Sequence, residues 1–347
     1  MKMKALILSA PNCFSVEETL IPEVGEGDIL LQMKASAICG TDIRILEGKK
    51  TKGVRYPSII GHEICGLIHS IGKNVKGFAL GDKIAIAPVI PCHACHSCLH
   101  DRENACLNRK AIGYEFDGGF AEYVLVPRVA LDSGNAVKLP EHVSFKEGAL
   151  IEPLSCCIRG LRNAGIGMGD NVLIIGTGPI GLMHVQLSKL AGAAKVIVSE
   201  PMPMRREKAL VLGADVVIDP QCEDLREIVM RETGGLGADV VIMAIGVPDL
   251  VDPALKLCRR GGTVNLFAGF SGTGESRIEA NTIHYNEINV NGSTAFKRCD
   301  YLDSARLVSE KKINLEEIIS HTFGIEEFGK AYDVCKSLEG LKVIIEP

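Results

Sequence analysis

The 347-residue sequence contains no tryptophan, and Phe, Trp and Tyr together make up only 5% of it. Single-stranded nucleic acids bind largely by stacking their bases on aromatic side chains. The chain also lacks an excess of positive charge: its formal net charge is −5, whereas binding a polyphosphate needs a basic face. The two absences argue against nucleic acid as a partner.

Long hydrophobic runs are missing too. Only residues 171–188 lack Asp, Glu, Lys and Arg over a span that could cross a membrane. This span contains GTGPIG together with His184 and Gln186, so we interpret it as a strand, a turn and a helix. The opening MKMKALIL is too short and too soon interrupted to act as a secretory signal. We therefore expect a cytoplasmic protein with no membrane association.

Cysteine, in contrast, is abundant, with 13 residues. In a large chain without a secretory signal, clustered cysteines are expected to be thiolate ligands of a metal rather than disulfides. The scattered ones are expected to be small buried hydrophobes, namely Cys65, Cys156, Cys157, Cys258 and Cys335.

The hydrophobic pattern divides the chain into parts. Residues 1–155 contain short apolar runs separated by Gly and Pro, which predicts a β-barrel-like unit. Residues 156–290 alternate apolar strands with amphipathic helices, which predicts an α/β fold with a doubly wound parallel sheet. Residues 291–347 return to mixed character, with helices expected near 300–311 and 326–338 and a closing strand at KVIIE.

A glycine motif lies in the predicted parallel sheet. In VLIIGTGPIG, Gly176, Gly178 and Gly181 have the spacing G-x-G-x-x-G between a strand and a helix. These glycines allow a tight turn, close approach of a pyrophosphate and close helix packing, and the helix N-terminus stabilises the phosphate charge. The alternative interpretation of this motif is a glycine-rich turn with a purely structural role. The context favours a dinucleotide site that includes Pro179 and Ile180.

Glu200 ends the next predicted strand, where its carboxylate would accept both ribose hydroxyls and repel a 2′-phosphate. The sequence therefore predicts NAD rather than NADP. Arg205, the nearest cation, completes the expected cofactor-site residues, although it and Arg206 begin the next helix and are expected to face solvent.

A zinc motif follows from four cysteines between residues 92 and 106. Their spacing, C-x2-C-x2-C-x7-C, suits four thiolates closing tetrahedrally around one zinc ion, which is the arrangement of a structural site. His93, His96 or His100 remains an alternative ligand. The predicted ligands of this lobe, at about residues 90–110, are Cys92, Cys95, Cys98 and Cys106.

A second set of ligand-type residues is dispersed along the chain. Cys39 lies in AICGTD, His62 and Glu63 lie in GHE, and Glu152 lies in IEPLS. Cysteine, histidine and carboxylate with a labile fourth position can hold a catalytic zinc. Each residue alone is equally compatible with a structural role.

GHEICG, AICGTD, the four-cysteine lobe, DGGFAEY, IEPLS and VLIIGTGPIG occur in the order found in the zinc-dependent medium-chain dehydrogenase/reductase family. The chain resembles the polyol branch of that family along essentially its whole length. The resemblance implies a GroES-like catalytic domain, a Rossmann-type NAD-binding domain and two zinc ions per chain. It also implies Cys39, His62 and Glu152 around the catalytic zinc, with Glu63 as a ligand or an alternating ligand.

The resemblance further implies hydride transfer from a secondary alcohol to NAD. The family position of Thr41 takes the substrate proton and passes it on through the cofactor ribose, and Asp42 is expected to accept the second ring N–H of His62. The usual relay histidine is replaced by Arg44, which cannot release a proton near neutral pH. Arg44 therefore either leaves the relay to another group or anchors the substrate.

A basic stretch follows, with Lys49, Lys50, Lys52 and Arg55. It is expected to be either a solvated loop or a segment that attracts an acidic or phosphorylated polyol.

Two other functions remain open: a zinc-free quinone or enone reductase of the same superfamily, and an inactive binding or redox-sensing protein. The resemblance also implies that the apolar segment 288–296 pairs across a two-fold axis in a homodimer or homotetramer.

Overall fold

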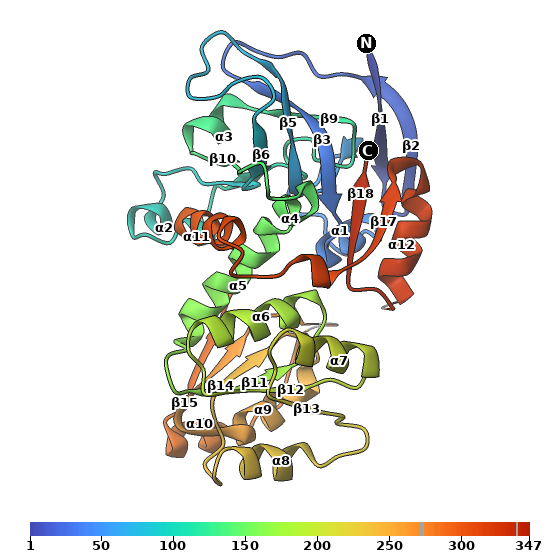
Figure 1. Ribbon diagram of the computed structural model, residues 1–347. Coiled ribbons are helices and arrows are strands. Elements are labelled where there is room, and N and C mark those ends of the chain that lie inside the picture. Colours follow the sequence, from blue (N-terminus) through green and yellow to red (C-terminus); the bar gives the residue numbers. More distant parts are fainter. Residues whose placement is uncertain (271, 273, 338) are drawn as a thin grey trace. The chain divides into compact units, whose positions relative to one another are not determined.

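The computed structural model describes residues 1–347 except 271, 273 and 338, and it divides into two compact units. The first unit joins Met1–Ser155 to Lys297–Pro347, and the second is Cys156–Phe296. The chain therefore leaves the first unit and returns to it (Figure 1). The second boundary lies at 296, compared with the 290 expected from the hydrophobic pattern.

The first unit is built on sheets in which all strand pairs except β17–β18 are antiparallel. A seven-stranded sheet has the order β10-β6-β5-β3-β18-β17 with β9 beside β3, and a three-stranded sheet has the order β2-β1-β4. The strands are β1 Lys2–Ala10, β2 Cys13–Leu20, β3 Ile29–Ala37, β4 Ser58–Ile59, β5 Glu63–Ile71, β6 Lys83–Ile86, β7 Val89–Ile90, β8 Lys110–Ala111, β9 Tyr123–Val126, β10 Ala136–Lys138, β17 Ile319–Gly324 and β18 Lys342–Glu346.

Helices of the first unit are mostly short. They are α1 Gly40–Leu46, α2 His96–Leu99, α3 Arg128–Asp132, α4 Phe145–Ala149, α11 Arg298–Ser309 and α12 Phe328–Ser337, with 3₁₀ turns at Glu103–Ala105, Glu316–Ile318 and Ile325–Glu327. The longer α5, Ile151–Ala164, begins in this unit and continues into the next. The two helices and the closing strand expected in the returning segment are present as α11, α12 and β18.

The returning segment supplies part of the first unit's core. Phe328 of α12 packs edge-on against Phe14 and at a tilt against Phe120, with ring centroids 6.1 and 5.1 Å away. Ile345 of β18 belongs to the same buried cluster. β18 also pairs with the end of β3, where Ile344 lies opposite Ala37. This packing fixes the segment just after β3, where Cys39 lies.

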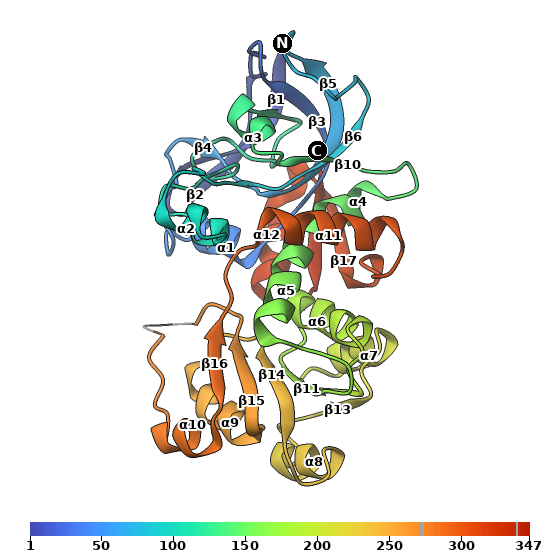
Figure 2. The same ribbon diagram turned by 90° about the vertical axis from the view of Figure 1, so that its left-hand side faces the viewer.

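The second unit is a parallel sheet of order β13-β12-β11-β14-β15-β16. Its strands are β11 Asn171–Ile175, β12 Lys195–Ser199, β13 Val216–Ile218, β14 Ala238–Met243, β15 Cys258–Leu266 and β16 Asn289–Gly292. Its helices are α6 Pro179–Leu190, α7 Pro203–Val211, α8 Leu225–Glu232, α9 Val251–Leu257 and α10 Ala280–Asn286. Figure 2 shows α6 and α7 on one side of the sheet and α9 and α10 on the other, so the expected doubly wound fold is confirmed.

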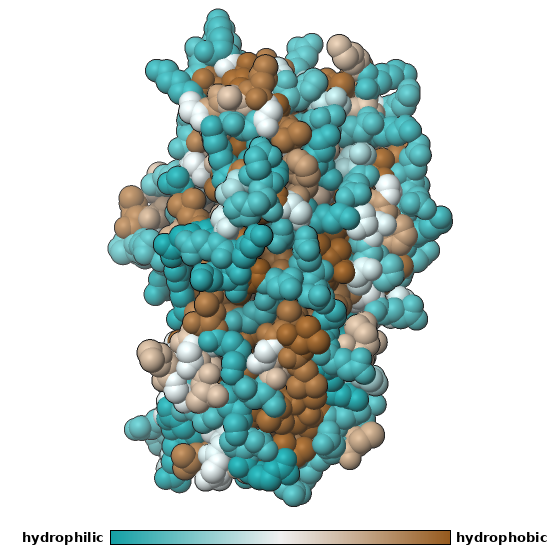
Figure 3. Space-filling view, viewed as in Figure 1, coloured by the Kyte–Doolittle hydropathy of each residue, from teal (hydrophilic) through white to brown (hydrophobic). Residues whose placement is uncertain are grey.

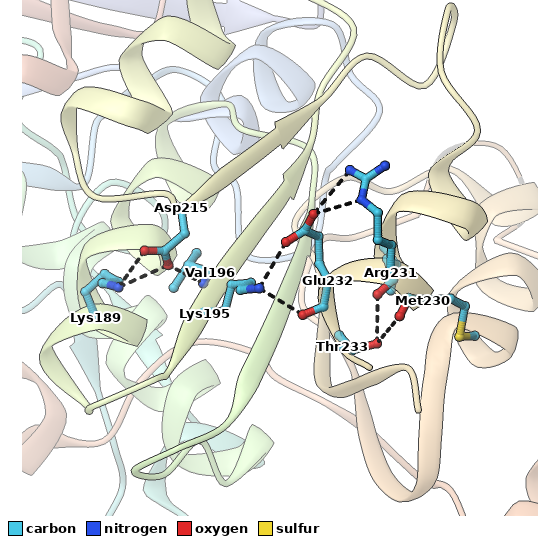
Figure 4. Close-up of polar contacts among 9 residues, drawn as sticks. Lys189, Lys195, Val196, Asp215, Met230, Arg231, Glu232 and Thr233 are labelled. Carbon is cyan, nitrogen blue, oxygen red and sulfur yellow. Dashed lines mark hydrogen bonds and ion pairs between the residues drawn. The ribbon is translucent and has the colours of Figure 1, made fainter. Parts of the chain in front are cut away.

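Polar contacts tie the strand ends of this sheet to its helices (Figure 4). Lys189 of α6 bonds both carboxylate oxygens of Asp215 at 3.0 Å, and that carboxylate accepts the backbone N–H of Val196. Lys195 bonds the carboxylate of Glu232 at 3.0 Å and its carbonyl at 2.9 Å. These contacts hold β12 in register beside α6 and α8.

The visible surface is mostly hydrophilic (Figure 3), as expected for a chain in which 23% of the residues are charged. In Figure 3 hydrophilic residues cover most of the visible face, and hydrophobic ones gather over the part of the chain that includes α6 and α7. Within the described residues, no helix combines the length and apolarity that a membrane crossing needs. Residues 171–188 form β11, the glycine turn and α6, as expected.

Candidate metal and cofactor sites

Within the described residues, two groups of three or more ligand-type side chains have their ligand atoms within 4.8 Å of one another. The first group is Cys92, Cys95, Cys98 and Cys106. The Sγ of Cys95 lies 3.6 Å from that of Cys98 and 3.8 Å from that of Cys106. Four sulfurs on one short segment fit a closed tetrahedral zinc site.

Local structure brings these sulfurs together. Cys95 precedes α2 and Cys98 lies within it, while Cys106 ends the 3₁₀ turn that follows. Backbone N–H groups, first that of Cys98, lower the pKa of the Cys95 thiol to about 6, so this sulfur already favours the thiolate. The three lobe histidines are not in the group: His96 and His100 stack on each other, and His93 bonds Ser133.

The lobe is held against the start of α11. Lys297 bonds the carboxylate of Asp101 at 2.6 Å, and the backbone N–H of Arg298 donates to Glu103. The Arg298 side chain also donates to the carbonyl of Gly134 at 3.3 Å. Figure 2 shows α2 and α11 side by side. These two basic residues are therefore engaged with the lobe.

The second group is Cys39, His62 and Glu63, which come from two different elements. Cys39 is the N-cap of α1: its sulfur accepts the Thr41 N–H at 3.4 Å, and its own N–H donates to Asp42 at 2.9 Å. Glu63 begins β5 and His62 directly precedes it, and β5 pairs with β3 so that Glu63 lies opposite Ala37. Strand pairing thus places the GHE segment beside the residue that starts α1.

Charged neighbours surround this group. The Nδ1 of His62 lies 3.0 Å from the Asp42 carboxylate, which leaves the other ring nitrogen for a metal. Burial lowers the pKa of His62, but Asp42, together with Tyr114 and Cys39, raises it well above the usual value. The Lys342 ammonium of β18 bonds both oxygens of Glu63.

Lys342 was not anticipated from the sequence. Burial would lower its pKa, but the Glu63 carboxylate holds that pKa above the usual value, and both side chains are almost fully buried. The available signal was a single lysine at the start of the apolar strand KVIIE. The buried site thus places the Lys342 ammonium and the His62 imidazole, both with raised pKa, among several acidic side chains.

Glu152 lies in the first turn of α5 and is 8% exposed. It is outside the group of three, so its role as a metal ligand stays a prediction. Burial raises its pKa to about 7, against the opposing effect of His62. A cysteine, an imidazole and buried carboxylates, with an acid of raised pKa beside them, fit a divalent cation such as zinc. Thr41 is half-buried at the start of α1, and Arg44 is exposed.

The glycine loop has the geometry that a pyrophosphate needs. Gly176 has φ +88°, and a Cβ at Gly181 would lie 2.0 Å from the Gly176 carbonyl oxygen. Gly178 is the N-cap of α6, with Pro179 at its first turn and Ile180 next. The N–H groups at this helix start are oriented as an anion site requires.

Glu200 directly follows β12, as expected, and its carboxylate contacts the loop. It accepts the N–H of Thr177 at 2.7 Å and that of Met202 at 3.1 Å. The expectation that Arg206 faces solvent is wrong. Its guanidinium donates to the carbonyls of Glu200 and Pro201 and pairs with Asp219 at 3.1 Å, because the turn after Glu200 brings its backbone over α7. Arg205 is half-buried as well.

A nucleotide-type loop in a parallel sheet, with a thiolate–imidazole–carboxylate group in a separate antiparallel unit, defines a metal-dependent oxidoreductase. Residues 25–141 match the family described as alcohol dehydrogenase GroES-like domain, and residues 179–310 match that described as zinc-binding dehydrogenase. The chain belongs to the zinc-binding dehydrogenases, in the polyol branch of the medium-chain family.

Two relatives and one solved structure show the extent of the similarity. L-threonine 3-dehydrogenase of Thermococcus kodakarensis is 34% identical, over 100% of this chain and 98% of that protein. Sorbitol dehydrogenase of Halalkalibacterium halodurans is 34% identical, over 99% of each. The crystal structure of a Sinorhizobium meliloti protein bound to NADP is 35% identical, covers 100% of both chains and has a TM-score of 0.94.

The family settles the class of reaction. The protein is a zinc-dependent dehydrogenase that uses a nicotinamide dinucleotide, with a small-molecule substrate. The findings support this function over a zinc-free reductase or an inactive sensor.

Proposed function

We propose that the protein oxidises a secondary alcohol of a polyol or hydroxy acid, with NAD as the hydride acceptor, at the Cys39–His62–Glu63 group. The observation that carries this proposal is the contrast between the two ligand groups. One consists of four cysteines from a single segment, and the other combines a cysteine, a histidine and one carboxylate, that of Glu63, with Thr41 beside them. The first suits a closed structural zinc, and the second an open catalytic one.

Cys39, His62 and Glu152 would hold the catalytic zinc, with Glu63 as the alternating carboxylate. Cys92, Cys95, Cys98 and Cys106 would hold the structural zinc. When bound, the catalytic zinc supplies a Lewis acid for the alcohol oxygen, and the nicotinamide accepts the hydride. Asp42 fixes the tautomer and orientation of His62 through its 3.0 Å contact. Lys342 balances the charge of Glu63.

Thr41 would take the alcohol proton, because it lies two residues after the predicted ligand Cys39 and its backbone N–H donates to the Cys39 sulfur. The proton would then leave by water, because Arg44 is exposed and cannot accept it. Arg44 would instead act on the substrate.

NAD is the proposed form of the cofactor. Glu200 follows β12 beside Gly176, Gly178, Pro179, Ile180 and Gly181, and its charge would repel a 2′-phosphate. Arg206 is already bound to two carbonyls and Asp219, which reduces its capacity to offset that repulsion. Arg205, also half-buried, stays in the proposed site.

Homo-oligomer formation and cytoplasmic activity are part of the same proposal. β16 is the last strand of its sheet, and Asn289, Val290 and Gly292 are exposed, so its edge suits pairing with a second copy. Free cysteines and thiolate clusters suit a reducing compartment.

Metal analysis and a dehydrogenase screen test this function. Two zinc ions per chain, and NAD reduction with at least one polyol, aldonic acid, sugar phosphate or threonine, are expected. One zinc per chain, or a folded, zinc-loaded protein that oxidises no alcohol, would contradict the proposal. Sedimentation at micromolar concentration should show a dimer or tetramer, and a monomer would contradict the proposed homo-oligomer.

A further inference from the structure

The basic stretch that follows α1 separates into paired and unpaired cations. Lys49 pairs with Glu47 at 2.7 Å, and Arg55 pairs with Asp117 at 2.7 Å. Within the described part of the chain, no carboxylate lies within ion-pair distance of Arg44 or Lys50. Carboxylates therefore compensate the charges of Lys49 and Arg55, whereas Arg44 and Lys50 are available to bind an anion.

Lys50 lies at the edge of the catalytic group. Its ammonium lies over the ring of Tyr114, 4.9 Å from the ring centre. The Tyr114 ring in turn lies 5.5 Å, centre to centre, from the ring of His62. The Tyr114 ring thus lies between the Lys50 ammonium and His62, a predicted zinc ligand. If the alcohol group of a substrate lies at Cys39 and His62, the other end of a short carbon chain can reach the ammonium.

Two guanidinium groups reinforce this positive charge. The backbone N–H of Lys50 donates to the carbonyl of Arg44 at 3.0 Å. Burial lowers the pKa of Lys50, and the charges of Arg109 and Arg44 lower it further. Arg109 likewise has no ion-pair partner within the described residues. Glu115 and, to a smaller extent, Cys39 oppose this effect, and the Glu115 carboxylate also accepts the N–H of Ala111 at 2.8 Å. The cluster of Arg44, Lys50 and Arg109 therefore keeps a positive excess.

The ammonium of Lys50 is partly buried beside the like charges of Arg44 and Arg109, which is costly unless an anion joins them. A planar guanidinium beside an ammonium suits the oxygens of a carboxylate or a phosphate. We infer that the cluster of Arg44, Lys50 and Arg109 binds an anionic group at the far end of the substrate, so that the enzyme prefers aldonates or polyol phosphates to neutral polyols. This inference rests on the proposed alcohol oxidation at Cys39 and His62.

The test compares three substrates of one carbon skeleton: a neutral hexitol, its hexonate and its terminal phosphate. The zinc-loaded enzyme with NAD should show kcat/KM at least tenfold higher for one of the two anions than for the neutral compound. Raising the ionic strength should reduce this advantage, because Arg44 and Arg109 are exposed. The two anionic arms show whether the recognised group is a carboxylate or a phosphate.

Lys50→Met removes the charge and keeps an apolar stem against Tyr114. The anion-to-neutral ratio of kcat/KM should fall about 10- to 100-fold. Lys49→Met is the matched control: it removes the same charge from the next position, but its ammonium is already paired with Glu47, and the ratio should change less than about threefold. Arg109→Gln gives a second variant should Lys50→Met fail to fold.

Three outcomes would overturn the inference: equal or better turnover of the neutral hexitol, an equal loss on both kinds of substrate in Lys50→Met and Arg109→Gln, or an equal effect of Lys49→Met. Turnover of neutral polyols alone would sink this inference and leave the proposed function standing. Absence of turnover on every alcohol would remove the proposed function itself.

Discussion

The two units bury polar groups in opposite ways. The first unit encloses a set of ionisable side chains that compensate one another: Asp42, His62, Glu63, Glu152 and Lys342 are all less than a tenth exposed. The second unit has an aliphatic core, and its nucleotide loop depends on glycine backbone and one carboxylate, Glu200. A metal site needs charged ligands that are buried away from water, whereas a phosphate site needs only backbone N–H groups at a helix N-terminus.

This difference predicts where substitutions are costly. In the first unit, removing one charge leaves its partner buried without compensation. In the second, the important groups are backbone atoms, so changes at Glu200 or His184, outside the loop glycines, should shift cofactor preference or pH response rather than abolish the fold.

Cys39→Ala should have the largest effect on activity. It removes a predicted ligand from the open group but leaves the core packing intact, so kcat should fall at least about 10³-fold, or about 4 kcal/mol of activation free energy. Zinc content should drop from two to one per chain, with an unchanged circular dichroism spectrum. Retained activity would show that Cys39 is not a ligand.

Cys95→Ala is the contrasting change within the same unit. Zinc binding to a closed site is coupled to folding, so this variant should lose thermal stability or fail to assemble, even though the open group is untouched. Thermal unfolding monitored with and without a chelator measures this. If Cys95→Ala is as stable as the unmodified protein while Cys39→Ala is not, the structural and catalytic roles are reversed.

Lys342→Met should destabilise the protein by about 3–5 kcal/mol, because the buried Glu63 carboxylate loses its counter-charge. Denaturant unfolding measures the loss. The double variant Glu63→Gln/Lys342→Met should recover part of it, since neither remaining group is charged. A single-variant loss below about 1 kcal/mol would mean that Glu63 finds another cation.

The sequence was sufficient where ligands are close together along the chain or follow a local rule. The four-cysteine lobe, the glycine loop and Glu200 after β12 all belong to one segment or one strand–turn–helix unit. It was insufficient where pairing between distant elements decides the contact. Lys342 reaches Glu63 only because β18 pairs with β3, and β3 pairs with β5.

The same reasoning explains two other differences. Arg206 was expected to face solvent because Pro201 and Pro203 turn the chain, but that turn exposes backbone carbonyls which the guanidinium then binds. Among the basic residues after α1, Lys49 is paired with Glu47, two positions before it, whereas Lys50 has no ion-pair partner among the described residues and lies over the ring of Tyr114. Charge is visible in a sequence, whereas its compensation is not.

Cofactor preference tests the second unit. NAD should exceed NADP at least about tenfold in kcat/KM, equivalent to about 1.4 kcal/mol, because a 2′-phosphate would meet the Glu200 charge. Glu200→Ala should narrow this gap without raising activity with NAD. Glu200→Gln is the matched variant, since it removes the charge but keeps an oxygen for the Thr177 N–H. Equal use of both cofactors by the unmodified protein would mean that Glu200 does not face the ribose.

His184 provides the smallest and most specific test of the second unit. Its side chain is fully buried in α6, with the Phe267 ring 4.7 Å away, and neither ring nitrogen has a hydrogen-bond partner among the described residues. Burial lowers its pKa to about 3. The folded pKa is therefore below the unfolded value of about 6.5, so the unfolded chain binds an extra proton as the pH falls below that value.

Because of this extra proton, stability contributed by neutral His184 is complete above about pH 6.5 and is lost toward pH 3, by up to about 1.4 kcal/mol per pH unit. His184→Met keeps an apolar side chain in the space and removes the titration. Between pH 7 and pH 5.5 the unmodified protein should lose about 1 kcal/mol more unfolding free energy than this variant, as measured by urea unfolding. His284→Met, which removes an exposed histidine from the same unit, is the control and should lose as much as the unmodified protein. An identical loss in His184→Met would show that the buried ring has a proton acceptor, and that the second unit also compensates its buried polar groups.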